Sequence, residues 1–383
     1  MRVLVLHNRY RVTGGEERAV ELHAAALAAA GVEHRVLARD SAEAGRGRAA
    51  AALLRGGEDP GEVARAVAEL GADVVHCHNM QPLFGPRALA AAREAGARVV
   101  LHLHNFRLFC AIGVAFRDGA PCFRCRGGNT IPGLALNCRG SVAEAAVYAT
   151  ALARRLPQVV AVVDRFVAPS AWAAGQLVRL GLPAERVTAL PHYLPADEVA
   201  PASAAHEGEY ALAAGRLAPE KGLEAAIDAA AEAGVPLRIA GDGPLAGALE
   251  RRARERGAPV RLLGRVEADE LRRLRRGAAL FVAPTRGSET FGLAALEAMG
   301  AGLPVVAARA GALPELVGEE RCVPRDDTAA LAAAMRALWE DPDRRRAEGE
   351  ALLARARERF SRERFTGDLL ALYEGVLSGR SGA

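Results

Sequence analysis

The sequence predicts an α/β protein of two doubly wound domains, each a parallel sheet with helices on both faces. Three observations support this prediction. The chain has 383 residues, which is enough for two domains. Short apolar runs alternate with helical segments, as in parallel strands that are buried on both faces. A segment with three prolines, Pro191 to Glu209, reads as a linker between a first alternating series and a second.

The first series predicts a domain over residues 1–190. Its expected strands are Val3 to Leu6, His34 to Ala38, Val74 to Cys77, Arg98 to Leu103 and Phe166 to Pro169. Its expected helices are Glu16 to Ala30, Glu62 to Leu70, Pro86 to Ala95, Val142 to Leu156 and Ala171 to Leu180. Ligands of such folds bind beyond the carboxyl ends of the strands. No G-x-G-x-x-G motif follows the first strand, which argues against a dinucleotide-dependent oxidoreductase.

The second series begins at Tyr210 and repeats the pattern through Val323, which predicts a domain over residues 209–358. Its first strand is expected at Ala211 to Ala214. Two amphipathic helices, Asp343 to Phe360 and Arg362 to Leu377, are expected at the end of the chain.

Composition sets limits on location and partners. No apolar run approaches the ~18 residues of a membrane-spanning helix, and no secretory signal is visible, so we expect a cytoplasmic protein. Its six cysteines are then reduced or metal-bound. Residues 1–190 carry 23 arginines against 16 acidic residues, a net charge of +7. This charge suits an anionic acceptor or peripheral binding at the inner face of the membrane, and scattered solvated arginines explain it equally well.

One stretch of the second domain, Pro284 to Val306, combines the features of an anion site. A strand leads into a loop with Glu289, and a helix then starts around Gly292 and carries Glu297. The start of a helix offers backbone N–H groups and a positive dipole end to an anion. The two carboxylates can bind hydroxyl groups on either side of a diphosphate. A nucleotide sugar has this layout.

These residues also carry a resemblance. Glu289 and Glu297, followed by the run AMGAGLP and by Gly311 to Val317, resemble family 4 of the retaining glycosyltransferases. The resemblance covers the second domain closely and the first in outline. It implies the GT-B fold, with two Rossmann-like domains facing a cleft. It also implies that the C-terminal helix, 362–383, packs back on the first domain.

The resemblance further implies an activity. Such enzymes transfer a hexose, with retention, from a nucleoside diphosphate sugar to a hydroxyl acceptor, and they need no catalytic metal. The donor is expected to be a UDP- or GDP-sugar. The acceptor is expected to be a glycan or a lipid-linked glycan of the cell envelope, and no nucleic acid is expected as a partner.

The motif G-R-L-x-x-x-K-G supplies the cations for the diphosphate, Arg216 and Lys221. Lys221 is the only lysine of the chain, and a compact ammonium is not equivalent to a planar guanidinium. By resemblance, Glu297 binds the ribose, and Glu289 binds the sugar and phosphate together with backbone amides. Those amides belong to Phe291, Gly292 and Leu293.

Weaker motifs complete the expected donor site. Gly241 and Gly243 resemble a glycine loop beside the nucleotide, and Arg265 and Val266 resemble the stretch that reads the base. In the first domain, Gly14 and Gly15 resemble the family's N-terminal glycine loop, which lies against the donor phosphates or the acceptor.

Two strand ends in the first domain carry paired histidines, His76 with His78 and His102 with His104. Each pair lies on one face of its strand, because side chains alternate. A zinc site is one interpretation of the four. By resemblance, His104 is instead the histidine near the reaction centre, and buried histidines satisfied by the backbone are a third interpretation.

An insertion over residues 106–140 contains Cys110, Cys122, Cys125 and Cys138. Four thiolates at this spacing suit a structural zinc ion, and reduced free thiols, a disulfide or an iron–sulfur centre are alternatives. The insertion also carries five arginines, and Phe106, Phe109, Phe116 and Phe123 lie among them. This mixture suits a surface that binds lipid headgroups or a lipid-linked diphosphate, or a structural flap whose phenylalanines pack inward.

Two rival functions differ in kind from a transferase. A sugar-nucleotide epimerase shares the two-domain architecture, and a non-catalytic regulator could bind a nucleotide sugar without turnover.

Overall fold

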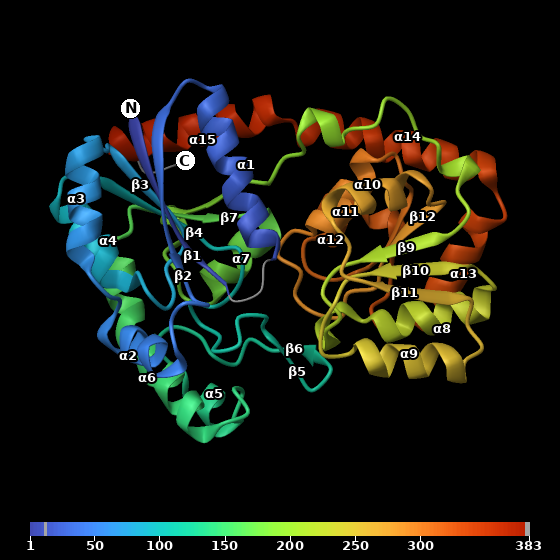
Figure 1. Ribbon diagram of the computed structural model, residues 1–383, viewed down its shortest axis with the longest axis horizontal. Coiled ribbons are helices and arrows are strands. Elements are labelled where there is room, and N and C mark those ends of the chain that lie inside the picture. Colours follow the sequence, from blue (N-terminus) through green and yellow to red (C-terminus); the bar gives the residue numbers. More distant parts are fainter. Residues whose placement is uncertain (11–13, 380–383) are drawn as a thin grey trace. The chain divides into compact units, whose positions relative to one another are not determined.

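The computed structural model describes residues 1–10 and 14–379, which form two α/β units (Figure 1). Unit 1 consists of Met1–Ala115, Cys122–His192 and Glu363–Ala383, and unit 2 consists of Phe116–Pro121 and Tyr193–Arg362. Each unit contains one six-stranded sheet in which all paired strands are parallel. The predicted fold class, two Rossmann-like α/β domains, is therefore confirmed.

The sheet of unit 1 has the strand order β2-β1-β3-β4-β7-β8. The strands are β1 (Arg2–Arg9), β2 (Glu33–Asp40), β3 (Val74–Asn79), β4 (Arg98–His102), β7 (Arg165–Ala168) and β8 (Val187–Ala189). The helices are α1 (Gly15–Ala29), α2 (Arg46–Arg55), α3 (Pro60–Leu70), α4 (Gly85–Glu94), α5 (Ile131–Ala135), α6 (Val142–Val162), α7 (Ala171–Arg179) and α15 (Arg362–Leu377).

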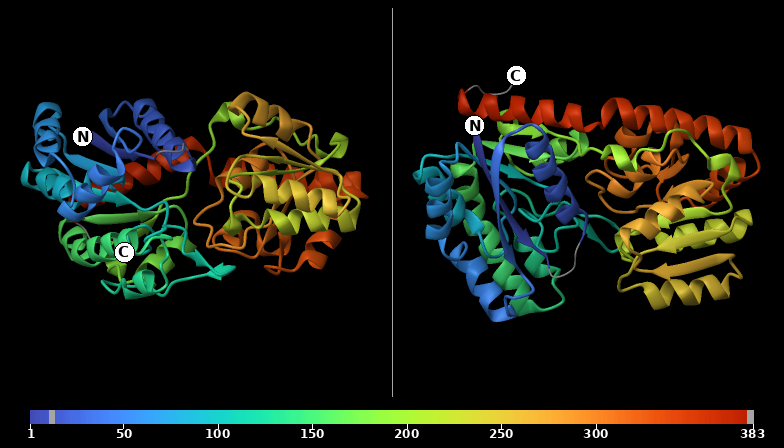
Figure 2. Two further views of the ribbon diagram at one scale, coloured as in Figure 1. Left: turned by 60° about the horizontal axis from the view of Figure 1, so that its bottom comes forward. Right: turned by 45° about the horizontal axis from the view of Figure 1, so that its top comes forward.

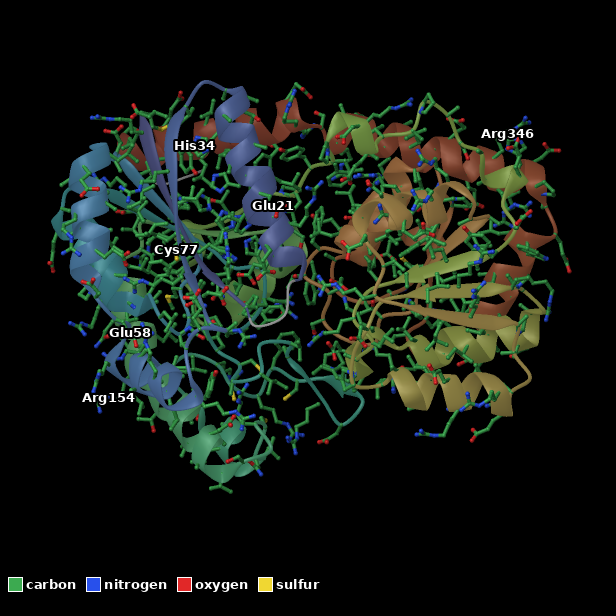
Figure 3. The ribbon with its side chains drawn as sticks, in the orientation of Figure 1. Glu21, His34, Glu58, Cys77, Arg154 and Arg346 are labelled. Carbon is green, nitrogen blue, oxygen red and sulfur yellow. The ribbon has the colours of Figure 1, made fainter. Side chains whose placement is uncertain are left out.

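Alternation along the strands assigns side chains to the two faces of this sheet. Leu4, Leu6, Val75 and Cys77 belong to one hydrophobic cluster with residues of α3, α4, α6 and α7. Cys77 is labelled in the middle of the sheet in Figure 3. The intervening residues of β3 point to the opposite face, where His76 contacts residues of α1 and α15. The two faces thus differ in chemistry as well as in the helices that cover them.

Helix α15 is part of unit 1 from Glu363 onward. Leu369 and Tyr373 are its most deeply buried side chains, with none of their surface exposed. Of the expected C-terminal helix, residues 380–383 lie outside the part of the chain that the structure describes.

Some elements within residues 1–192 differ from the sequence prediction. Helix α2 was not expected, and α6 continues past Leu156 to Val162 with Pro157 inside it. The insertion contains a short hairpin, β5 (Phe116–Arg117) and β6 (Ala120–Pro121), and the one-turn helix α5. Alanine-rich or short segments carry little hydrophobic periodicity, so tertiary packing decides where they begin and end.

The sheet of unit 2 has the order β11-β10-β9-β12-β13-β14. The strands are β9 (Ala211–Ala214), β10 (Leu237–Ala240), β11 (Val260–Gly264), β12 (Leu280–Ala283), β13 (Val305–Ala308) and β14 (Cys322–Val323). The helices are α8 (Leu223–Ala233), α9 (Ala246–Glu255), α10 (Ala268–Arg276), α11 (Leu293–Gly300), α12 (Leu313–Val317), α13 (Thr328–Trp339) and α14 (Pro342–Arg359). Helices α8, α9 and α13 cover one face, and α10, α11, α12 and α14 cover the other (Figures 1 and 2).

The domain limits expected from the sequence, 1–190 and 209–358, can be compared with the limits of these two units. The longer segment of unit 2 begins at Tyr193, inside the segment expected as a linker, and ends at Arg362. Short 3-10 turns at Ala196–Glu198 and Ala205–Glu207 occupy part of that segment. None of the helices in the described ranges combines the length and the apolar character needed to cross a bilayer.

Candidate functional site

An ion pair joins two of the expected site residues, Lys221 and Glu289, in unit 2. The ammonium of Lys221 lies 2.6 Å from Oε2 of Glu289, and both side chains are largely shielded from solvent. The two residues are 68 positions apart in the sequence. The structure therefore brings together two residues that sequence motifs had assigned to the same donor.

Close backbone packing explains how these two loops meet. The N–H groups of Arg286 and Gly287 both donate to the carbonyl oxygen of Glu220, at 3.0 and 2.9 Å. A Cβ atom on Gly222 would lie 2.2 Å from the carbonyl oxygen of Pro284. Only a glycine allows this approach, so the loop after β9 and the loop after β12 are locked side by side.

The glycine loop at the end of β10 packs on the same region. Gly241 has φ of +146°, and a Cβ atom there would lie 1.9 Å from the carbonyl oxygen of Gly215. The N–H of Leu217 donates to the carbonyl of Asp242 at 2.9 Å. Gly243 makes a similar approach to Leu217. The expected glycine motif is thus adjacent to the loop that carries Arg216 and Lys221.

Glu297, on α11, pairs with a residue that the sequence analysis did not single out. Its carboxylate forms a short ion pair with the guanidinium of Arg275, which is 5% exposed. Arg275 lies on α10, and no local motif marks it. A buried guanidinium needs an anion nearby, so Arg275 orients the carboxylate that was expected to bind the ribose.

Arg216 has a carboxylate partner of its own. It forms a short ion pair with Glu220, four residues later, and its side chain remains about half exposed. Both expected phosphate-binding cations are therefore neutralised by carboxylates in the protein alone. Arg265 is exposed just beyond β11, and Val266 is half-buried and packs against a hydrophobic cluster of unit 2. Their expected role in reading the base stays a prediction.

The helix start expected around Gly292 is confirmed to within one residue. Helix α11 begins at Leu293, and Gly292 at its N-cap has φ of +106° and no side chain to cap the helix. Phe291 contributes a buried ring that meets Phe360 at 5.9 Å, so only its backbone can serve a ligand. Glu289 lies in the loop before this helix.

In unit 1, His104 lies just beyond β4, beside a small pocket of about 20 Å³. A pocket of this size holds about one water molecule. Its polar lining includes Glu16, His78, His102, His104, Asn105 and Arg107. Burial lowers the pKa of His104 well below its usual value, so its ring is neutral near pH 7.

The buried carboxyl group of Glu16 was missed by the sequence analysis. Asn105 donates to it at 3.1 Å, and the hydroxyl of Tyr10 also bonds to it. Burial raises its pKa to about 8, against which the bonds from Tyr10 and Asn105 and the charge of Arg107 act only in part. Glu16 lies in the first turn of α1, directly after Gly14 and Gly15, and this position was the one feature of the sequence that could have marked it as a site residue.

Gly14 and Gly15 themselves mark the start of α1. The N–H of Gly14 donates to the carboxylate of Glu17 at 2.7 Å, and the same carboxylate accepts the N–H of Tyr10. Both glycines are exposed. The pair therefore forms a short exposed turn whose backbone is held by Glu17.

The four cysteines of the insertion lie near one another in a loop-rich region. Backbone N–H groups of Ile112, Gly113 and Ala115 donate to the sulfur of Cys110, and that of Gly133 donates to Cys125. Such bonds favour thiolates. Burial nevertheless raises the pKa of both thiols. Within the described residues, the groups of metal-ligating atoms that lie within 4.8 Å of one another contain histidines only.

The aromatic residues of the insertion do not form its surface. Phe106 and Phe109 are 1% exposed and Phe116 is buried, while Phe123 packs against the same core as Phe106. The rings therefore pack inward, as expected for a structural flap, and lipid binding by the arginines of the insertion stays a prediction. Phe106, Phe109 and Phe123 pack on the hydrophobic core of unit 1, and no local pattern in the sequence shows this contact.

Two family models match most of the chain. "Glycosyl transferase 4-like domain" matches residues 14–192, and "Glycosyl transferases group 1" matches residues 208–341. The chain is therefore related to glycosyltransferases in both units.

Curated relatives match over shorter segments. The sulfoquinovosyl transferase SQD2 of Arabidopsis thaliana is 43% identical over 112 residues, or 28% of this chain. A GDP-mannose-dependent phosphatidylinositol dimannoside mannosyltransferase of Mycobacterium tuberculosis is 37% identical over 164 residues, or 41% of this chain. The matched segments span only 21% and 42% of those proteins' own lengths.

Solved structures match the whole chain in fold. HepE of Anabaena, crystallised with UDP, has a TM-score of 0.68 at 19% identity, with 98% of this chain and 100% of that chain covered. The sucrose-phosphate synthase of Thermosynechococcus elongatus has a TM-score of 0.74 at 18% identity, with 99% and 100% covered. The chain has the GT-B fold that these proteins share.

The raised pKa of Glu16 predicts a specific pH dependence of stability. The folded state keeps the proton up to about pH 8, whereas an exposed carboxyl releases it near 4.5. Folding therefore takes up a proton between these values, and the free energy of unfolding falls as the pH rises through this window. Glu16→Gln should remove this loss, which is of the order of a few kcal/mol.

Urea unfolding of unit 1 at several pH values measures this loss of stability. All variants also carry Trp339→Phe, so that the fluorescence comes from Trp172 of unit 1 alone. Glu21→Gln is the matched control, because Glu21 is exposed on the same helix (Figure 3). An equal pH dependence in the Glu16→Gln and Glu21→Gln variants would contradict the buried, protonated carboxyl.

Proposed function

We propose that this chain, which matches glycosyltransferase models over residues 14–192 and 208–341, is a retaining glycosyltransferase that transfers a hexose from a nucleoside diphosphate sugar. The acceptor is a hydroxyl group of a lipid-linked or cell-envelope glycan. The observation that carries the proposal is the meeting of Lys221 with Glu289 beside the start of α11.

The two cations of unit 2 support a diphosphate at this place. Lys221 and Arg216 are each paired with a carboxylate of their own unit. A diphosphate can replace these carboxylates as the partner and then leave with its developing charge stabilised. Glu289 is then released to accept hydrogen bonds from hydroxyl groups of the sugar, and Glu297, oriented by Arg275, accepts hydrogen bonds from those of the ribose.

The reaction needs no base from the protein in this proposal. The bond between the sugar's anomeric carbon and the phosphate oxygen breaks, and a bond to the acceptor oxygen forms on the same face. The acceptor's proton passes to the departing phosphate oxygen. His104 contributes near the sugar, and its neutral ring can accept or donate one hydrogen bond.

The nucleotides named for similar proteins suggest which donors to test first. HepE was crystallised with UDP and, in other crystals, with UDP-glucose. The mycobacterial relative is described as GDP-mannose-dependent. A thermal-shift screen of UDP, GDP and ADP therefore comes first, followed by NMR of the products formed from the matching sugar nucleotides.

Each outcome of that experiment decides between the candidates. Slow release of a free sugar with retained anomeric configuration supports a retaining transferase. Conversion of one sugar nucleotide into its epimer supports an epimerase. Binding of the nucleotide sugar without turnover, in the presence of glycan acceptors, supports a regulator.

Lys221→Arg should lower the turnover number at least tenfold, or ~1.4 kcal/mol of transition-state stabilisation, while leaving the fold intact. A guanidinium cannot take the position of the compact ammonium beside Glu289. The assay is donor hydrolysis under saturating donor. Arg251→Lys, on the exposed side of α9, is the matched control and should keep the wild-type rate. A wild-type rate in Lys221→Arg would refute the phosphate role.

We also propose that Cys110, Cys122, Cys125 and Cys138 hold one structural zinc ion. The spacing of the four thiols and the amide bonds to two of their sulfurs support the proposal. Zinc would fix the fold of the insertion and take no part in the transfer. The four thiols would lose their protons when the ion binds.

Elemental analysis of protein purified without added metal should therefore give about one zinc per chain. Cys122→Ser with Cys125→Ser should lose the ion and loosen residues 106–140 in hydrogen exchange. Cys322→Ser, in unit 2, is the control and should retain the zinc. Less than about a tenth of an equivalent in the wild type would sink the proposal.

A lipid-linked acceptor is supported by a surface of the insertion region. Arg124 and Arg126 are exposed. Of the large apolar side chains of the described chain, Ile131 and Val142 are the most exposed, at 71% and 68%. Exposed arginines close in sequence to exposed apolar side chains suit binding to anionic lipid headgroups.

Sedimentation with vesicles tests this surface. The protein should bind anionic vesicles at low salt and leave them at ~0.5 M salt, because exposed charges are screened. Arg124→Ser with Arg126→Ser should abolish binding without changing donor hydrolysis. Arg251→Ser with Arg254→Ser removes two exposed charges from unit 2 and should keep binding. Equal binding to neutral and anionic vesicles, or none to either, would point to a water-soluble acceptor.

A further inference from the structure

The small pocket of unit 1 lies at the carboxyl ends of β3 and β4, beside His104. Ligands of parallel α/β folds bind at this edge of the sheet. The first turn of α1 adds Glu16 to the wall of the pocket. The volume of about 20 Å³ admits one water molecule or one group of the size of a hydroxyl, so the rest of a larger ligand would lie outside it.

Three residues that line this pocket have buried side-chain atoms without a hydrogen-bond partner in the described part of the chain. These atoms are Oε1 of Gln81, both ring nitrogens of His102, and Nε of Arg107. The side chains of His102 and Gln81 are deeply buried, with only 1% and 9% of their residues' surface exposed. Most buried polar groups in proteins are paired, and an unpaired one destabilises the fold. Four unpaired atoms on residues around one pocket therefore indicate a ligand that binds there.

The chemistry of the four atoms indicates the class of that ligand. Oε1 of Gln81 can only accept a hydrogen bond, and Nε of Arg107 can only donate one. Burial lowers the pKa of His102 well below its usual value, so its neutral ring has one donor and one acceptor. The set thus contains two donors and two acceptors. A hydroxyl group both donates and accepts, so it can pair with members of either kind.

Charged ligands match this set less well. An anion only accepts hydrogen bonds, so it would leave Gln81 and the bare nitrogen of His102 unpaired. An ammonium group or a metal ion would leave the donors unpaired, and Arg107 would repel it. The guanidinium of Arg107 also lies over the ring of Tyr10, 5.1 Å from its centre, which offsets part of its charge.

Glu16 adds a further neutral group to the same wall. Burial raises its pKa to about 8, so near pH 7 its carboxyl is protonated and can both donate and accept. Asn105 donates to this carboxyl at 3.1 Å, and the hydroxyl of Tyr10 also bonds to it. These bonds hold the carboxyl in place. Glu16 thus has the same two-way hydrogen-bonding chemistry as a hydroxyl ligand.

We infer that this pocket is a subsite for one hydroxyl group of a neutral sugar, which Gln81, His102 and Arg107 contact. The assignment of that sugar to the acceptor rests on the proposed function. The class of group that binds, a hydroxyl instead of a phosphate, rests on the pocket alone. Within the proposed function, the pocket therefore anchors a sugar of the acceptor glycan, and a lipid-linked diphosphate must bind elsewhere.

Ligand-observed NMR on the full chain, without any donor, tests the inference. The probes are the methyl glycosides of glucose, galactose and mannose, and the monodeoxy derivatives of whichever binds most tightly. One derivative should bind about tenfold more weakly than its parent, because the missing hydroxyl leaves the polar atoms of the pocket unpaired. The other derivatives should lose less affinity.

A variant of the pocket completes a double-mutant cycle with the ligand. Gln81→Met keeps the length of the side chain but removes its amide. It should weaken binding of the parent glycoside about tenfold. It should not weaken binding of the one sensitive deoxy derivative any further, because the same hydrogen bond is lost in both cases.

Gln158→Met is the matched control, because Gln158 is exposed on α6 of unit 1, and it should leave every affinity unchanged. The melting temperature separates an effect on binding from an effect on folding. Since Oε1 of Gln81 has no partner within the described fold, Gln81→Met should not lower the melting temperature. A fall of several degrees would show that the amide is paired in the fold and would contradict the inference.

Four further results would overturn the inference: no binding of any of the three glycosides, equal binding of all deoxy derivatives, an unchanged affinity in Gln81→Met, or tighter binding of methyl phosphate that Arg107→Met abolishes. The last result would make the pocket an anion site. Glycoside binding in the expected pattern without hydrolysis or transfer from any sugar nucleotide would keep the subsite and refute the proposed function. Donor hydrolysis without glycoside binding would do the reverse.

Discussion

Side-chain alternation along buried parallel strands is the constraint on which this molecule depends. In unit 1, β3 and β4 are covered on both faces, so each side chain must fit one of two environments. Val75, Cys77 and Leu101 take the hydrophobic face. The histidines take the other. A shift of one residue in either strand would exchange these two sets and leave imidazoles in a hydrocarbon core.

The same constraint explains why α15 belongs to unit 1. Most buried polar groups have a hydrogen-bond partner, although among the described residues both ring nitrogens of His102 and Nε2 of His76 have none. For one nitrogen of His23 and one of His76, the partner comes from another element. Tyr373 provides it, at the cost of burying a hydroxyl that burial keeps un-ionised by raising its pKa. The C-terminal helix thus serves the polar face of the sheet as well as covering it.

In unit 2, the main constraint is the gathering of several charged groups at one edge of the sheet. Lys221, Arg216 and Arg275 each contact a carboxylate, which offsets the cost of partial burial. Backbone contacts that only glycine permits bring the loops after β9, β10 and β12 together. These contacts fix the positions of the backbone carbonyl and amide groups around the charged side chains.

The sequence by itself determined the fold class, because the alternation of apolar runs and helices favours parallel sheets covered by helices, and the linker segment divides them into two domains. It also identified Lys221, Glu289 and the glycine loops, since each lies in a short contiguous motif at a strand end. The sequence could not predict contacts between distant segments, because no local pattern marks them. Arg275 contacts Glu297, and Tyr373 contacts His23 and His76. Glu16 looked like an ordinary first-turn acid until burial raised its pKa. Only the tertiary structure could decide these points, because burial and pairing are properties of the packed chain, not of its local sequence.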